Sequence, residues 1–251
     1  TILRTRRDHR TGRLTDAQMR VAAPVPVGAI GMWKVRPTGL RADRFYSRAC
    51  DDLVGAAAAL SALDALRRAP PEATVAALLT RAEEDGFIGA IGAAARPELL
   101  RHRDRIISLE ASAAQPFAPL GGGPVVRIGD KTAIFSSALS SFLTGQAAAL
   151  ARRDRHFFFR RALMPGGTCE ATAFQAFGFT AAALCVPLGN YHNMDRNRKR
   201  VGAEYVNLDD YLGLVRLLLA VARASHDFHP DHRELKNRLA RLFATRRHLL
   251  A

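Results

Sequence analysis

The sequence has few cysteines and no long apolar run, and both absences exclude classes of protein. The three cysteines, Cys50, Cys169 and Cys185, are widely spaced in 251 residues, so they form neither a zinc knuckle nor a paired disulfide framework. We therefore expect a reducing compartment and a cytoplasmic location. The apolar stretch VRLLLAVA at 215–222 is bracketed by charge and is far shorter than the roughly 18 apolar residues of a membrane span. No membrane partner is predicted.

Acidic residues are also scarce relative to basic ones. The chain has 37 Lys and Arg against 23 Asp and Glu, a formal net charge of +14, which can indicate a nucleic-acid partner. However, the basic residues are dispersed, without interleaved aromatics or a recognisable binding module. No nucleic-acid partner is therefore predicted. The chain begins at Thr1 without a signal peptide, which says little because it can begin inside a longer precursor.

The order of elements predicts an α/β fold. Residues 1–45 are set apart: a polar, turn-rich start is followed by short strands between Pro and Gly at 21–35. After Cys50, apolar periodicity predicts helices at 51–69, 86–95, 136–153, 167–178, 205–224 and 232–250. Strands are predicted at 74–80, 105–111, 157–163 and 179–189, and a glycine-rich loop leads into another at 121–130. This alternation predicts a mostly parallel central sheet flanked by helices.

Polar side chains gather where the predicted strands end. Ligand sites in such sheets lie outside the carboxyl ends of the strands. Carboxylates and a histidine that converge there are suitable ligands for zinc or a similar ion. An additional carboxylate can act as general base toward a metal-activated water. The candidates are Asp51, Asp52, Glu83, Glu84, Glu110 and His192.

Each candidate also has an ordinary structural interpretation. The paired aspartates can be N-terminal helix charges, and the paired glutamates in TRAEEDGFIGA can be capping acids before the next helix. Glu110 can lie in a surface turn, and His192 can be a hydrogen-bonded loop histidine. The site is favoured because all of them occur together, in this order, at predicted strand ends.

These segments resemble a known enzyme family. CDDLVG, TRAEEDGFIGA, GGTCEA and VPLGNYHN are similar to LDDR-x-G, T-x-x-EE-x-G-x-x-GA, GGTDA and P-x-R-Y-x-H of the co-catalytic dizinc aminopeptidases, in their glutamyl and tetrahedral branch. The EE-x-G-x-x-GA segment is the most specific part. The resemblance implies a catalytic α/β domain at 46–251, preceded at 1–45 by the end of a small β-rich inserted domain.

The resemblance also implies roles for individual residues. Asp51 would bridge two divalent metals, zinc or else Co or Mn. Asp52 would follow a strained peptide bond and orient the site. Glu83 would be the general base that takes a proton from the bridging water, and Glu84 and His192 would complete the ligands of one ion.

The ligands of the second ion depart from the family pattern. Glu110 lies where the family has an acidic ligand, more often Asp. The family's remaining ligand is a histidine from an upstream His-x-Asp motif, which this sequence does not show. His9, in a polar turn-like segment, is the one histidine before Asp51. Either the chain is part of a longer protein, or its lineage has lost one metal, so we expect a complete site for one ion and an incomplete site for the other.

The predicted function is a metal-dependent aminopeptidase that hydrolyses N-terminal residues of peptides and forms a homo-oligomer. The alternative is a catalytically impaired or non-peptidase relative, a scaffold or amidohydrolase, with an incomplete second metal site. Cys169 as a nucleophile is a weaker alternative. Asp130 could interact with a substrate amine or serve in a turn. Gly189 and Asn190 replace a frequent arginine, which affects substrate anchoring.

Overall fold

The computed structural model describes residues 1–251 apart from 12–13, 36–37 and 251. It divides into two compact units, Thr1–Lys34 and Val35–Ala251. In the first, strands β1 (Ile2–Arg7) and β2 (Leu14–Met19) form an antiparallel hairpin. The sequence did not predict this hairpin, because every residue of both strands is on the exposed surface and the strands show no apolar alternation. The short strands predicted at 21–35 are wrong: this segment is irregular, and its prolines lack the N–H that a strand ladder uses.

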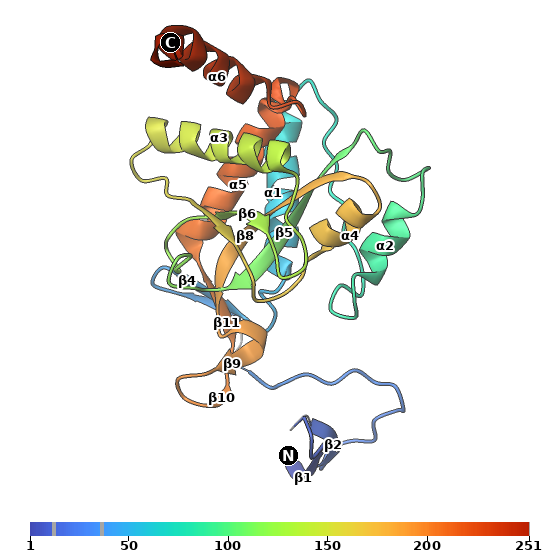
Figure 1. Cartoon of the computed structure of the whole chain (residues 1–251). Coiled ribbons are helices and arrows are strands. Elements are labelled where there is room, and N and C mark those ends of the chain that lie inside the picture. The colour runs from blue at the N-terminus through green and yellow to red at the C-terminus, as the bar shows by residue number, and fades with distance from the viewer. Residues whose placement is uncertain (12–13, 36–37, 251) are drawn as a thin grey trace. The chain divides into compact units, whose positions relative to one another are not determined.

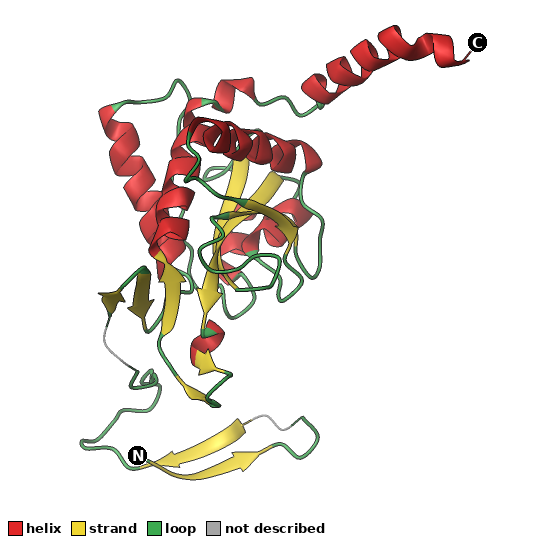
Figure 2. Ribbon diagram, turned by 90° about the vertical axis from the view of Figure 1, so that its left-hand side faces the viewer, coloured by secondary structure: helices red, strands yellow, loops and turns green. Residues whose placement is uncertain are grey.

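The second unit is built on a seven-stranded sheet (Figures 1 and 2). The strand order is β3-β4-β11-β8-β6-β7, and β5 also pairs with β8. The α/β class with a central sheet flanked by helices is confirmed, but the mostly parallel arrangement that the sequence predicts for this sheet is wrong. β5–β8 and β6–β7 are parallel, whereas the other pairings are antiparallel, so the sheet is mixed. The strands are β3 (Gly39–Arg41), β4 (Arg44–Ser47), β5 (Arg105–Ala113), β6 (Val125–Gly129), β7 (Arg160–Leu163), β8 (Thr180–Gly189) and β11 (Glu204–Asn207).

β8 is the centre of the core. Its residues from Ala181 to Gly189 are all buried, as expected for a continuous apolar run covered on both faces. Its three consecutive alanines, Ala181–Ala183, are fully buried. Beyond β8, the small strands β9 (Met194–Asp195) and β10 (Arg200–Val201) form a separate ribbon.

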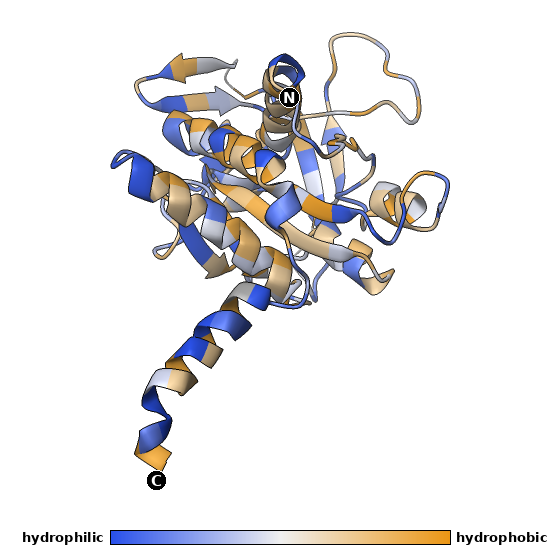
Figure 3. Cartoon of the chain, turned by 90° about the horizontal axis from the view of Figure 1, so that it is seen from above, coloured by the Kyte–Doolittle hydropathy of each residue, from blue (hydrophilic) through white to orange (hydrophobic). Residues whose placement is uncertain are grey.

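The helices fall into two groups (Figure 1). Helices α1 (Leu53–Arg68), α3 (Ser137–Arg153) and α5 (Leu208–Arg223) pack together and against the sheet. Helices α2 (Ile88–Ala94) and α4 (Glu170–Ala176) pack together, with α4 against β5 and β8. The C-terminal helix α6 (Arg233–Arg246) combines polar residues with the exposed apolar residues Leu235, Leu239, Leu242 and Phe243 (Figure 3). No helix in the described part of the chain is long and apolar enough to span a bilayer.

The prediction of a buried strand at 74–80 is wrong. This segment is irregular and mostly exposed, with Val75, Leu78 and Leu79 at 40%, 42% and 57% exposure. An apolar run becomes a strand only where a neighbouring strand accepts and donates its backbone hydrogen bonds. Within the described residues, no strand lies alongside it.

The domain boundary predicted at 45/46 stays a prediction. The boundary between the two compact units of the structure lies between Lys34 and Val35. β3 lies on the N-terminal side of the predicted boundary and β4 crosses it, yet the two strands pair with each other and, through β4, with β11 of the main sheet.

Asp210 fixes the glycine-rich loop that leads into β6. This fully buried carboxylate accepts hydrogen bonds from the backbone N–H of Gly121 (2.8 Å) and of Gly123 (2.7 Å). We expect Asp210→Asn to lower the free energy of unfolding by about 2–3 kcal/mol, because the amide NH₂ leaves one buried donor unpaired. Urea unfolding measures this. Asp209→Asn, on the same helical turn but exposed, is the matched control and should cost under about 1 kcal/mol; an equal loss in both variants would contradict the loop-fixing role.

Candidate active site

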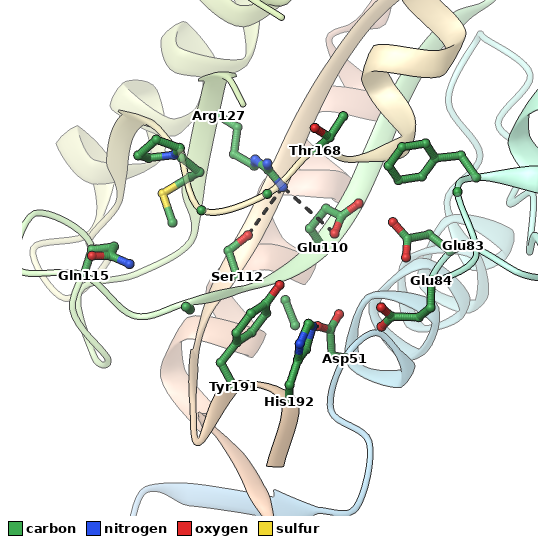
Figure 4. A pocket seen from close by; sticks show the side chains of 18 residues that line it. Asp51, Glu83, Glu84, Glu110, Ser112, Gln115, Arg127, Thr168, Tyr191 and His192 are labelled. Atoms are coloured by element: carbon green, nitrogen blue, oxygen red, sulfur yellow. Dashed lines mark hydrogen bonds and ion pairs between the residues drawn. The ribbon is translucent and has the colours of Figure 1, made fainter. Parts of the chain in front are cut away.

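A cavity of about 240 Å³ opens beside the carboxyl ends of β5 and β8. Its walls come from segments far apart in the sequence: the turn between β4 and α1, the loop before α2, strands β5 and β6, the loop after β7, and the segment after β8 (Figure 4). The parallel pairing of β5 and β8 places the ends of both strands at the same edge of the sheet. Five of the six predicted site residues line it: Asp51, Glu83, Glu84, Glu110 and His192.

The Asp51–Asp52 pair is held by contacts on both sides. The peptide bond between the two residues is cis. The backbone N–H of Asp51 donates to the buried Glu204 carboxylate (3.1 Å), and Asp52 caps helix α1 by accepting from the N–H of Gly55 (3.1 Å). Asp51 lines the cavity. Asp52 does not line it and caps the start of α1 instead.

Glu83 and Glu84 lie in a tight turn that opens α2. The N–H groups of Gly86 and Phe87 donate to the carbonyl of Glu83. Gly86 adopts a φ of +101°, which glycine tolerates best, and a Cβ on Gly89 would lie 2.5 Å from the carbonyl oxygen of Arg81. The turn thus requires both glycines of EE-x-G-x-x-G, and it brings both carboxylates to the cavity (Figure 4).

His192 lies close to Asp51, which is between His192 and Glu84 (Figure 4). Its Nε2 lies 3.9 Å from Oδ2 of Asp51, and its ring stacks on Tyr191 with centroids 3.9 Å apart. Ligand atoms of Asp51, Glu84 and His192 all lie within 4.8 Å of one another. Three residues separated by long stretches of sequence thus form one compact set of two carboxylates and an imidazole.

Glu110 belongs to a different cluster. It projects from β5, where Ser108 donates to one of its carboxylate oxygens (3.4 Å). The other oxygen lies 4.0 Å from Nη1 of Arg127, on β6, and the same guanidinium donates to Ser112 (3.4 Å). Glu110 and Arg127 are both largely buried, with side-chain exposures of 13% and 4%.

The carboxylates of the cavity are electrostatically crowded. Burial raises the pKa of Asp51 to about 8, and the neighbouring Asp52 and Glu84 add to the shift. Burial likewise raises the pKa of Glu83 to about 7, with Glu84 as the next cause. Such crowding favours either protonation or a bound cation that lies between the carboxylates.

The comparisons with known proteins fit this geometry. The family model of the M42 glutamyl aminopeptidases matches residues 13–217. The chain belongs to the M42 glutamyl aminopeptidase family. Among solved structures, the TET1 peptidase of Pyrococcus horikoshii, which can assemble into a tetrahedron or a large octahedral shell, is 26% identical, with a TM-score of 0.62 over 74% of this chain and 52% of that chain. No curated protein sequence matches.

Other structures related to this M42 chain show the same coverage. PhTET1, described as a dodecamer, is 27% identical with a TM-score of 0.62 over 75% of this chain and 53% of that chain. The TET aminopeptidase of a marine sediment Thaumarchaeota archaeon, at 20% identity and a TM-score of 0.63 over 74% of this chain and 52% of that chain, supports the fold. The M42 chain thus spans about half the length of these structures.

The M42 family implies a divalent metal, and one group of residues fits such an ion. Asp51, Glu84 and His192 supply the oxygen and nitrogen donors that zinc and similar metals accept. Their closeness brings two carboxylates together at a site where a cation would relieve the repulsion. Glu110 is not part of this group, and its carboxylate lies 4.0 Å from the Arg127 guanidinium.

Sequence reasoning missed several residues of the cavity. Arg127, Tyr191 and Thr168 line it, yet none stands out in the sequence, because Arg127 is one of 37 basic residues and Thr168 lies in a loop. Tyr191 is adjacent to a predicted ligand, which is the signal that could have identified it. His9, in contrast, lies in the turn after β1, within the first unit.

Two secondary candidates have structural roles. Both oxygens of the buried Asp130 are occupied: they accept hydrogen bonds from backbone N–H groups of the following turn and of Cys169, and from the hydroxyl of Thr172. Asp130 thus serves the turn rather than a substrate amine. Cys169 is fully buried, and burial raises the pKa of its thiol, which disfavours the reactive thiolate.

Proposed function

We propose that this protein is a metal-dependent aminopeptidase that removes N-terminal residues from peptides. The observation that supports this most is the cluster of Asp51, Glu84 and His192 beside Glu83, within one cavity of an M42-family fold. In this proposal Asp51, Glu84 and His192 hold a divalent ion, zinc or else Co or Mn. The assignment of Glu110 to a second ion stays a prediction.

Each residue has a defined task in the proposed reaction. The bound ion would supply Lewis-acid polarisation of the scissile carbonyl and a lowered pKa of the attacking water. Glu83 accepts the proton of that water and delivers it to the leaving amine, because it reaches the cavity without belonging to the ligand cluster. Asp52 acts as a positioning residue, since it caps α1 directly after Asp51.

The cavity is suited to a short, extended segment of peptide. Its wall combines carboxylates with the apolar side chains of Phe87, Met164 and Pro165. Excess negative charge attracts a protonated α-amino group, the feature that distinguishes an N-terminus from an internal peptide bond. The structure-related TET proteins form large assemblies, and we extend homo-oligomer formation, as well as a cytoplasmic location, to this protein as part of the proposal.

Metal removal tests the proposed mechanism. We expect the full-length protein to release chromogenic amines from aminoacyl substrates and to lose at least 90% of this turnover after treatment with a chelator, with recovery when zinc or cobalt is restored. A chelator already saturated with calcium is the control and should have no effect. Turnover that persists in the metal-free protein would contradict the mechanism.

A catalytically impaired relative is the second candidate. It is favoured by Glu110, whose carboxylate lies 4.0 Å from Arg127 and is not part of the ligand cluster. Under this alternative, the protein binds an ion without turnover of any aminoacyl substrate. The chelator experiment separates the two, because an impaired relative shows no turnover before or after metal removal.

A further inference from the structure

A positively charged side chain, that of Arg127, lines the cavity. Among the described residues that line it, four are carboxylates, and Arg127 is the guanidinium among them. Arg127 is only 3% exposed, and its Nη1 lies 4.0 Å from a carboxylate oxygen of Glu110 and 3.4 Å from the hydroxyl of Ser112. A buried guanidinium is always charged, so it provides permanent positive charge in this part of the cavity.

The sheet register explains how Arg127 reaches Glu110. Arg127 on β6 pairs with Ala183 on β8, which pairs in turn with Ser108 on β5. Paired residues project to the same face, so Arg127 shares a face with Ser108, Glu110 and Ser112, which are spaced two residues apart on β5. The long arginine side chain crosses β8 and reaches Glu110 and Ser112 on the far strand (Figure 4).

We propose that the Arg127 guanidinium takes the place of a second metal ion at Glu110, so that the protein binds one divalent ion per chain. This inference rests on the metal site of the proposed function. An ion bound by Glu110 would have to lie close to the guanidinium, and the two positive charges repel strongly in a buried setting. The same carboxylate cannot fully compensate both cations. Arg127 therefore separates the cavity into a metal half, at Asp51, Glu84 and His192, and an arginine half, at Glu110 and Ser112.

A second observation indicates that Arg127 does more than form a structural ion pair with Glu110. Its Nε is buried and has no hydrogen-bond partner among the described residues, although buried polar atoms are normally paired. The guanidinium thus keeps donor capacity beside the reaction centre. In this arrangement, the charge that a second metal would supply comes instead from a fixed organic cation.

The test is the number of ions per chain. The full-length protein, stripped of metal and titrated with zinc and, separately, cobalt, is expected to retain one ion per chain after gel filtration, measured by elemental analysis. Glu110→Gln is expected to retain that ion with an affinity within about threefold of the parent, because Glu110 is not a ligand. Two ions per chain in the parent, or a tenfold or larger loss of affinity in Glu110→Gln, would overturn the inference.

Variants of Arg127 test whether this residue is the reason that only one ion binds. In Arg127→Met, which keeps much of the apolar stem, Glu110 is left without a cation, and we expect a second, weaker ion to bind. Arg127→Lys keeps the charge and should retain one ion. A single ion in a folded Arg127→Met protein would show that Arg127 does not exclude the second ion and would overturn the inference. If that variant fails to fold, as judged by circular dichroism, the parent and Glu110→Gln still decide.

Failure of this inference is distinguishable from failure of the proposed function. Two ions with full peptidase turnover would remove the inference and leave the aminopeptidase proposal intact. One ion per chain without turnover would leave the inference intact and contradict the aminopeptidase proposal. A protein that binds no ion contradicts both.

Discussion

Glu83→Gln is expected to lower kcat for aminoacyl substrates by about 10²–10⁴-fold while the protein keeps its bound metal. Glutamine has nearly the same shape as glutamate but cannot accept a proton, so the variant removes the proposed general base alone. Steady-state kinetics on the full-length protein gives the loss of kcat, and elemental analysis of the same sample gives the metal content.

The neighbouring Asp85 provides the matched control. It lies in the same turn and is exposed, but it does not line the cavity. Asp85→Asn makes the same change of charge and should keep kcat within about twofold, because a surface substitution away from the site has little effect. Full activity in Glu83→Gln would show that another group takes the proton.

The sequence predicted most helices and strands well because their patterns are local. The buried run at 179–189 and the apolar faces of 51–69 and 136–153 specify β8, α1 and α3 almost to the residue. The failures are non-local. The apolar run at 74–80 has the composition of a buried strand, but whether it becomes one depends on a neighbouring strand.

The site was predictable where it depends on short motifs. The glycines of TRAEEDGFIGA encode the turn that presents Glu83 and Glu84. The turn requires a positive φ at position 86, and at position 89 it leaves no room for a Cβ beside the backbone of Arg81. Arg127 was not predictable, because its importance comes from the register of three strands. No local pattern distinguishes this arginine from the others.

Glu84→Gln is expected to abolish most activity by a different route from Glu83→Gln, although the two residues are adjacent. Loss of an ionised ligand should weaken metal binding by more than about 100-fold, beyond the 10–100-fold that is typical of changes to residues behind the ligands. Activity should fall with metal occupancy and should return in part when zinc or cobalt is added in excess. Isothermal titration measures the affinity, and the kinetics are followed at rising metal concentration.

The contrast between the two neighbours separates base from ligand. Excess metal cannot restore a missing base, so Glu83→Gln should stay inactive at any metal concentration. Metal binding to the folded state should raise the stability of Glu83→Gln by about 2.7 kcal/mol at a metal concentration 100 times Kd, whereas Glu84→Gln should show little of this gain at the same concentration. If both variants gained equal stability, Glu84 would not be a ligand, and the repulsion between these carboxylates would need a different compensating charge.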